Sequence, residues 1–185
     1  MKRFVGNCLV GCLIMLFPAA GQAQSRTPAA DSAAIGGDVG LFFPKADDLK
    51  AGLDLFGFYE YYPAPRTSFR LGLEWMNPQY DEDRDPDASV RVIRVGGDFV
   101  YNWERGAIHP FAGGGLGIYV LQPRNNGRNE GDSETKFGAS MFGGLEYFTS
   151  RTMAVKAEGR YHLVSDADGF DPDGLSLTVG LKKYF

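Results

Sequence analysis

Apolar side chains occupy every second position in eight stretches of this 185-residue chain, and this period of two constrains the fold more than any other feature. Within each stretch the odd-numbered residues are apolar, aromatic or glycine, with Lys183 as the exception. Many of the even-numbered residues between them are charged. Successive side chains of a β-strand point to opposite faces, so the pattern predicts eight strands with one apolar face each. The predicted strands span residues 35–43, 51–61, 69–75, 93–103, 111–121, 137–147, 153–163 and 175–185.

The N-terminal segment has the composition of a secretory signal peptide. Lys2 and Arg3 form a basic start, an apolar run extends from residue 4 to residue 17, and Gly21-Gln22-Ala23 supplies small residues for cleavage. We therefore predict that residues 1–23 are removed, that residues 24–34 form a flexible leader and that residues 35–185 form one domain. Cys12 ends a lipoprotein-like cleavage box, but the apolar run before it is short, so cleavage after Ala23 is favoured over lipoprotein processing.

Removal of this segment leaves an acidic domain without cysteine. Both cysteines, Cys8 and Cys12, leave with the signal, so no disulfide is expected. The net charge of the chain is −4, and the loss of Lys2 and Arg3 lowers it to −6, which argues against a nucleic-acid partner. No second run of about 20 apolar residues follows, so we expect no transmembrane helix. No cofactor is expected.

The connections between the predicted strands alternate in length. The segments at residues 44–50, 76–92, 122–136 and 164–174 are rich in Asp, Asn, Gly and Pro, whereas those at 62–68, 104–110 and 148–152 are short turns. An up-and-down sheet therefore places all the long loops at one end and both termini at the other. Outer-membrane barrels have this asymmetry, and strands of about 9–11 residues cross a bilayer. The sequence predicts an all-β, eight-stranded antiparallel transmembrane barrel, closed because open edges in lipid would leave backbone groups unpaired.

The even-numbered positions then face the barrel interior. Seven of them are acids and six are bases, with one histidine, so we predict a salt-bridged plug in place of an open pore. These residues are Asp38, Asp54, Glu60, Arg70, Glu74, Arg94, Asp98, Lys136, Glu146, Lys156, Glu158, Arg160, His162 and Lys182.

Aromatic residues gather near the two ends of the predicted strands, as expected of belts at the two membrane interfaces. We assign to these belts Tyr59, Tyr61, Trp75, Tyr101, Trp103, Tyr147, Tyr161 and Phe185, and in addition Phe43, Phe69, Phe111, Tyr119 and Phe137. The alternative is a soluble eight-stranded barrel of the lipocalin type, with an apolar interior and a polar exterior. That arrangement would bury the aromatic residues as a core and place the charged even positions outside, so the membrane form is favoured.

The chain resembles the family of small outer-membrane β-barrel proteins, the OmpA-like, OmpX-like and OmpW-like group. The resemblance spans the predicted mature chain and rests on Gly37-Asp38-Val39-Gly40, on residues 109–117, on Gly143-Gly144-Leu145-Glu146-Tyr147, on Glu158-Gly159-Arg160-Tyr161-His162 and on residues 179–185. It implies insertion in the outer membrane and contact with outer-membrane lipids and lipopolysaccharide. The terminal Phe185 resembles the signal that the barrel-assembly machinery recognises, although Lys183 departs from it. Because this fold hosts adhesins, anchors, conduits and enzymes, the resemblance leaves the function and any surface ligand open.

Two groups of residues have side chains that could form a chemical site. Lipid A deacylases place a Ser two residues after a His, but Val164 occupies that position after His162, and His162 falls on the predicted interior face. The neighbouring Ser165 and Asp166 therefore do not complete a catalytic set, His109 is expected in a turn, and no catalytic residue is predicted. Alternate acids around a glycine turn are suited to a divalent cation, which makes Asp166, Asp168, Asp171 and Asp173 a candidate metal site. The acidic run at residues 81–87 is similar in character.

We expect a protein without enzymatic activity that has a structural or surface-interaction role and presents four long external loops. The first alternative is an OmpW-like conduit for small apolar molecules, with Phe42, Phe56, Phe58 and Phe142 projecting inward to line a pocket. Packing within the plug is the favoured explanation of these phenylalanines. A lipid A-modifying enzyme is the second alternative, and the missing His-x-Ser motif argues against it.

Overall fold

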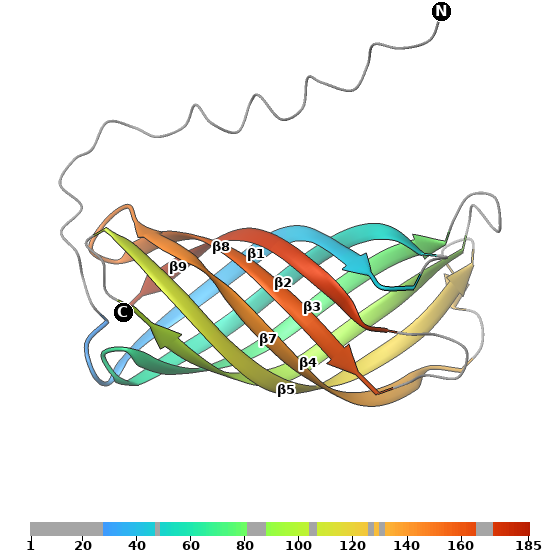
Figure 1. Ribbon diagram of the computed structural model, residues 1–185, viewed down its shortest axis with the longest axis horizontal. Helices are drawn as coiled ribbons and strands as arrows, with labels where there is room; N and C mark the ends of the chain where they lie inside the picture. Colours follow the sequence, from blue (N-terminus) through green and yellow to red (C-terminus); the bar gives the residue numbers. More distant parts are fainter. Residues whose placement is uncertain are drawn as a thin grey trace, which may run out of the picture.

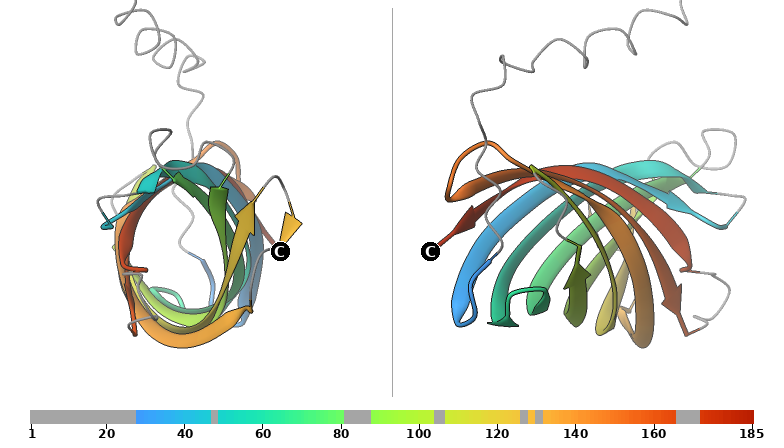
Figure 2. Two further views of the ribbon diagram at one scale, coloured as in Figure 1. Left: turned by 90° about the vertical axis from the view of Figure 1, so that its right-hand side faces the viewer. Right: turned by 60° about the vertical axis from the view of Figure 1, so that its left-hand side comes forward.

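The computed structural model describes residues 28–46, 49–80, 88–103, 107–125, 128–129, 132–165 and 172–185. Nine strands form one antiparallel sheet in the order β4-β3-β2-β1-β9-β8-β7-β5-β6, and a further β4–β5 pairing closes it (Figures 1 and 2). The strands are β1 (Ser32–Pro44), β2 (Leu49–Ala64), β3 (Thr67–Tyr80), β4 (Ala88–Asn102), β5 (Ile108–Asn125), β6 (Arg128–Asn129), β7 (Glu134–Phe148), β8 (Met153–Val164) and β9 (Gly174–Tyr184). Because β6 is a two-residue extension paired to the end of β5, the closed ring has eight strands, and the predicted fold class is confirmed.

The two ends of the barrel differ in their connections. At one end β1 begins and β9 ends, only Pro65 and Arg66 separate β2 from β3, and a short turn joins β7 to β8 (Figure 1, left). We call this the terminal end, and the opposite end, where the β3–β4, β5–β7 and β8–β9 connections are longer, the loop end. The first predicted long connection is short, because β1 ends at Pro44 and β2 begins at Leu49. Within the described residues, no helix is long and apolar enough to cross a membrane.

Several strands extend further than the sequence predicts. β1 begins at Ser32, inside the predicted leader, and β3, β4 and β5 continue into the predicted long loops. Gln79 pairs with Ser89, and Ala88 pairs with Asn125, so the hydrogen-bonded ladder persists beyond the apolar alternation. Backbone pairing needs no apolar side chain, and the loss of alternation therefore marks the edge of the apolar band and not the end of the strand.

The outward face of the barrel is apolar and the inward face is polar, as the alternation predicts. Leu71 is 68% exposed on the outside, whereas its neighbour Arg70 is 1% exposed on the inside. The same contrast separates Leu73 from Glu74 and Val155 from Lys156. The soluble alternative with an apolar interior is therefore wrong.

The predicted face assignment is wrong for one strand, β5. Here the odd-numbered Phe111 and Tyr119 are buried in the interior, and the even-numbered Leu116 and Ile118 point outward. Phe111 and Tyr119 thus do not belong to an aromatic belt. His109 lies within β5 and not in a turn; it is buried in the interior opposite Glu146.

Glycines facing inward make room for the aromatic side chains of neighbouring strands. A Cβ atom added at Gly72 would lie 2.3 Å from Cε2 of Phe56, and one added at Gly144 would lie 2.6 Å from Cζ of Phe111. These contacts show that the interior is filled to the point where a single methyl group cannot be added without movement.

Candidate functional site

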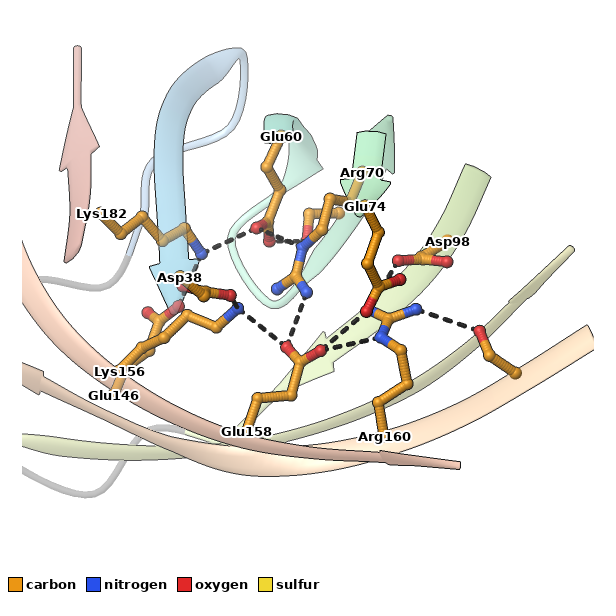
Figure 3. A network of polar contacts seen from close by, with 12 residues as sticks. Asp38, Glu60, Arg70, Glu74, Asp98, Glu146, Lys156, Glu158, Arg160 and Lys182 are labelled. Atoms are coloured by element: carbon orange, nitrogen blue, oxygen red, sulfur yellow. Dashed lines mark hydrogen bonds and ion pairs between the residues drawn. The ribbon is translucent and has the colours of Figure 1, made fainter. Parts of the chain in front are cut away.

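The centre of the barrel interior is organised around one carboxylate, Glu158 on β8. Its Oε2 accepts from Nη1 of Arg70 at 2.8 Å and lies 2.9 Å from Nζ of Lys156, and its Oε1 accepts from Nη2 of Arg160 at 2.9 Å (Figure 3). Lys156 in turn donates to Oδ2 of Asp38 on β1. Three cations from two strands thus share one acid, and every one of these side chains is buried.

Toward the loop end, the network continues through β4. Nη2 of Arg160 donates to Oδ2 of Asp98 at 2.9 Å, and Nη2 of Arg94 donates to Oδ1 of the same carboxylate at 2.6 Å. Nη1 of Arg94 also donates to Oε2 of Glu74 at 3.4 Å. The hydroxyl of Ser140 accepts from both arginines. Each guanidinium therefore spans several strands, which ties the walls of the barrel together.

Toward the terminal end, Glu60 and Glu146 hold a second group of cations. Oε2 of Glu60 accepts from Nε of Arg70 at 3.1 Å and lies 2.9 Å from Nζ of Lys182. Lys182 donates to Oε1 of Glu146 at 2.7 Å, and the Tyr184 hydroxyl donates to Oε2 of Glu146 at 2.6 Å. Arg70 links this group to Glu158, so the two parts form one continuous network, which we call the charged plug.

Three of the four inward phenylalanines, Phe56, Phe58 and Phe142, pack against cations of the plug. Phe56 and Phe58 stack at a centroid distance of 5.3 Å, and the guanidinium of Arg70 lies 4.5 Å from the Phe58 ring. The guanidinium of Arg160 lies 4.1 Å from the Phe142 ring, and Phe42 packs edge-on against His162. Cations over aromatic faces are attracted to the ring quadrupole. These rings therefore occupy the interior together with the charged groups and do not line an empty apolar pocket.

An apolar cluster covers the charged plug at each end. At the loop end this cluster comprises Phe42, Leu49, Met76, Val90, Val92, Tyr119, Leu121 and Val164, and at the terminal end it comprises Ala34, Tyr62, Phe148, Ala154 and Tyr184. The plug is thus enclosed on all sides by protein. Among its acids and bases Asp38, at 6%, is the most exposed. A low dielectric surrounds these charges, which strengthens each ion pair and raises the cost of losing one partner.

His162 belongs to a separate hydrogen-bonded group within the interior. Its Nδ1 lies 3.0 Å from the Tyr119 hydroxyl, its Nε2 lies 3.1 Å from the Ser176 hydroxyl, and Oε1 of Glu74 is 3.6 Å from Nε2. Ser165, the serine considered with His162 in the sequence, instead donates to the backbone oxygen of Phe137 at an exposed position. His162 and Ser176 are both buried in the interior, away from the outer surface.

Neither carboxylate oxygen of Asp54 accepts a hydrogen bond of ordinary geometry from the described residues, although the Ser176 hydroxyl and the charge of Arg160 lie close enough to act on it. It is 0% exposed and lies on β2 opposite Gly40 and Met76. Burial of an unpaired carboxylate costs free energy, because the lost hydration is not replaced. The charge of Asp54 is therefore less well compensated than the charges of the ion-paired acids in the charged plug.

The remaining interior base, Lys136, lies at the loop end of β7. Its Nζ is 3.2 Å from Oε2 of Glu134, and both side chains are partly exposed. Lys136 therefore lies at the loop end of the interior, outside the charged plug.

The predicted metal site lies mostly outside the described residues, since Asp166, Asp168 and Asp171 fall in segment 166–171. Asp173 is described: its Oδ1 accepts from the backbone nitrogen of Val164 at 2.8 Å, and its Oδ2 lies 3.6 Å from Nζ of Lys45. Within the part of the chain that the structure describes, no group of three or more His, Cys, Asp or Glu residues is placed to hold a metal ion. The acidic run at residues 81–87 also lies outside that part.

All eight residues assigned to the aromatic girdle lie on the outward face. Near the terminal end, the ring centroids of Tyr59 and Phe185 are 6.4 Å apart. At the same end, the rings of Tyr101 and Trp103 form an edge-on contact with a centroid distance of 5.0 Å. The other four girdle residues are Tyr61, Trp75, Tyr147 and Tyr161. A hollow of about 540 Å³ also lies on the outer surface, over β1, β7, β8 and β9, where Gly143, Ala157 and Gly159 are the small outward residues.

Sequence reasoning missed the neutral hydroxyl groups of the network. Ser68 donates to Glu60, Ser140 accepts from two arginines, and Ser176 contacts His162. Tyr62 accepts from Nζ of Lys182 at 2.6 Å. All four have even numbers and fall on the predicted inward face or directly beside a predicted strand, so the alternation that located the charges could also have located them.

A closed antiparallel barrel with an apolar exterior, aromatic residues toward its ends and a polar, filled interior defines the class of transmembrane β-barrels. Residues 10–182 match the family model described as outer membrane protein beta-barrel domain, and the chain belongs to this family. Its place is accordingly the outer membrane. No curated protein sequence matches the chain.

Several solved structures share the fold at low sequence identity. Neisserial surface protein A is 13% identical with a TM-score of 0.65, over 83% of this chain and 96% of that one. The N-terminal β-barrel domain of Pseudomonas aeruginosa OprF is 14% identical with a TM-score of 0.61, over 84% and 98%. The attachment invasion locus protein Ail of Yersinia pestis is 16% identical with a TM-score of 0.59, over 84% and 99%.

Proposed function

We propose that this protein is a non-conducting outer-membrane barrel with a structural or surface-interaction role, whose loop end faces the exterior. The observation that supports a closed lumen is the position of Glu158, which is held by Arg70, Lys156 and Arg160 at the centre of the interior. A solute crossing the lumen would have to displace these ion pairs and both apolar end clusters. Separating buried charges is costly, so the plug opposes any resting conductance.

The conduit alternative requires an apolar space in the lumen. Phe56, Phe58 and Phe142 instead pack against the guanidinium or ammonium groups of Arg70, Lys156 and Arg160. Plug packing therefore accounts for the phenylalanines that a conduit would need as its lining.

The orientation rests on the asymmetry of the connections. The β3–β4, β5–β7 and β8–β9 connections at the loop end are longer than any connection at the terminal end, although the β1–β2 connection is short. This asymmetry matches the arrangement of outer-membrane barrels, in which the longer loops are external. Two structures with the same fold bear the names of a surface protein and an attachment protein. A surface-exposed loop end is consistent with both names.

Conductance in planar lipid bilayers tests the closed lumen. We expect the purified, folded protein to give no steady unitary currents under conditions in which a reconstituted porin conducts. The matched variant is Glu158→Gln, which keeps the side-chain shape and removes the shared negative charge. Steady currents through the wild-type protein that Glu158→Gln alters would show that the lumen conducts, and the proposal would then be wrong.

Single cysteines test the orientation. Ser133, between β6 and β7 at the loop end, and Ser150, between β7 and β8 at the terminal end, are both exposed. A membrane-impermeant maleimide should label Ser133→Cys on intact cells and Ser150→Cys only after lysis. The reverse pattern would invert the proposed orientation, and the unsubstituted protein provides the background.

A further inference from the structure

The outward face at the loop end of β3, β4 and β5 is polar and carries two arginines. Along this part of the barrel the apolar band ends at Trp75, Ile93 and Val120, and the outward residues that follow are polar or basic. They are Asn77 and Gln79 on β3, Ser89 and Arg91 on β4, and Gln122 and Arg124 on β5. We call these six residues the rim patch.

The register brings the rim patch together on one surface. Gln79 lies opposite Ser89, Ser89 lies opposite Arg124, and Arg91 lies opposite Gln122. Arg91 and Arg124 are therefore diagonal neighbours on adjacent strands, a separation of about 7–8 Å that two long side chains span easily. Two guanidinium groups so placed can bind one phosphate from two sides, since each offers a planar pair of donors.

The neighbours of the two arginines also fit a particular ligand. Side-chain amides of Asn77, Gln79 and Gln122 and the hydroxyl of Ser89 offer donors and acceptors to sugar hydroxyls. Nε of Arg91 is buried and has no hydrogen-bond partner among the described residues. The exposed Lys50 on β2 pairs with Gln79 and adds a further basic residue beside the patch.

The position of the rim patch along the barrel axis, just beyond the apolar band, favours a lipid as the source of the phosphate. Moving toward the loop end, Arg91 is the next outward residue beyond Ile93 on β4, and Gln122 is the next beyond Val120 on β5. The patch thus begins where the apolar band ends, which is the level of lipid headgroups. We propose that the rim patch is a binding site for the phosphorylated sugar headgroup of an outer-leaflet glycolipid, with Arg91 and Arg124 as the phosphate ligands.

This proposal rests on the proposed orientation of the loop end for its biological setting, but the binding itself can be measured without reference to orientation. The experiment is native mass spectrometry of the folded protein in detergent, titrated with bisphosphorylated lipid A. The test variant carries Arg91→Gln with Arg124→Gln. The control carries Arg66→Gln with Arg151→Gln, two exposed arginines at the terminal end.

We expect the wild type and the control to retain lipid A, and the rim variant to lose roughly 10- to 30-fold in affinity, since each basic residue near a lipid surface contributes about a factor of five. Lipid A stripped of its phosphates should bind wild type and rim variant equally. Equal retention of phosphorylated lipid A by all variants would overturn the site. Displacement by millimolar inorganic phosphate would overturn the lipid assignment, because it would make the patch a simple anion site. A maleimide result that inverts the orientation would refute the proposed function while leaving this binding result intact.

Discussion

Arg70 and Glu158 join opposite walls of the barrel: Nη1 of Arg70 on β3 donates to Oε2 of Glu158 on β8 at 2.8 Å. Four strand steps separate β3 from β8 in either direction around the closed ring. The two residues are 88 positions apart in the chain, so the ion pair forms only after the sheet has curled onto itself. The charged plug therefore connects opposite walls of the barrel and also fills its interior.

Substitution of Glu158 is expected to destabilise the barrel strongly. In Glu158→Ala, three buried cations lose their shared acceptor, and loss of one partner from a buried ion pair costs about 3–5 kcal/mol. Urea-induced unfolding in detergent or lipid, followed by the mobility of unboiled samples on gels, measures the change. Glu134→Ala is the control, because Glu134 and its partner Lys136 are partly exposed and such pairs contribute about 0–1 kcal/mol. Equal losses in the two variants would contradict the role of the plug.

Substitution of Asp54 is expected to raise the free energy of unfolding, whereas substitution of Glu158 lowers it. Asp54→Asn removes a buried charge whose oxygens have no hydrogen-bond partner among the described residues, so the free energy of unfolding should rise by about 1–3 kcal/mol. Asp38→Asn is the matched control; it should lower the free energy of unfolding, because Asp38 accepts from Lys156. Both variants are compared with wild type by the same urea titration. Destabilisation by Asp54→Asn would show that its carboxylate is paired in the native protein.

The alternation of side chains was sufficient to predict the closed barrel and the inward face of seven strands. It failed on β5, where Gly113, Gly115 and Gly117 occupy three successive odd positions and glycine has no side chain to mark a face. Both Leu116 and Tyr119 are compatible with either side, and only the pairing to β4 and β7 decides between them.

The partners within the charged plug could not be predicted from the sequence. Alternation shows that Arg70, Arg160 and Glu158 face inward, but which acid meets which base depends on the stagger of strands across the lumen. The contact of His162 with Ser176 illustrates this, since Ser165 is nearer to His162 in the sequence but bonds to the backbone of Phe137 instead. The rim patch was also missed, because its strands continue beyond the end of the apolar pattern.

The close fit of glycines and aromatic rings gives a third prediction. A methyl group at Gly72 would collide with the ring of Phe56, which is held by stacking on Phe58. Gly72→Ala should therefore lower the free energy of unfolding by about 1–3 kcal/mol. Gly57→Ala on the outward face of β2 should be neutral or slightly stabilising, since a Cβ there meets nothing within 4 Å.

Adding Phe56→Leu to Gly72→Ala tests the cause of the loss. The smaller side chain vacates the position that the new methyl group needs, so the two substitutions together should cost less than the sum of the single changes. Strict additivity in a double-mutant cycle would show that the loss at Gly72 arises from backbone effects and not from the contact with Phe56.

The fourth prediction concerns chemistry on lipid A. His162 and Ser176 hydrogen-bond at 3.1 Å, which is within the range of a catalytic pair, yet both are enclosed between the charged plug and the apolar cluster at the loop end. Phe42 and Tyr119 of that cluster both pack against the ring of His162. Mass spectra of lipid A should therefore be identical in cells that express the wild type, Ser176→Ala or no protein. A mass loss equal to one acyl chain that depends on Ser176 would establish an enzyme, and would require the cluster at the loop end to open.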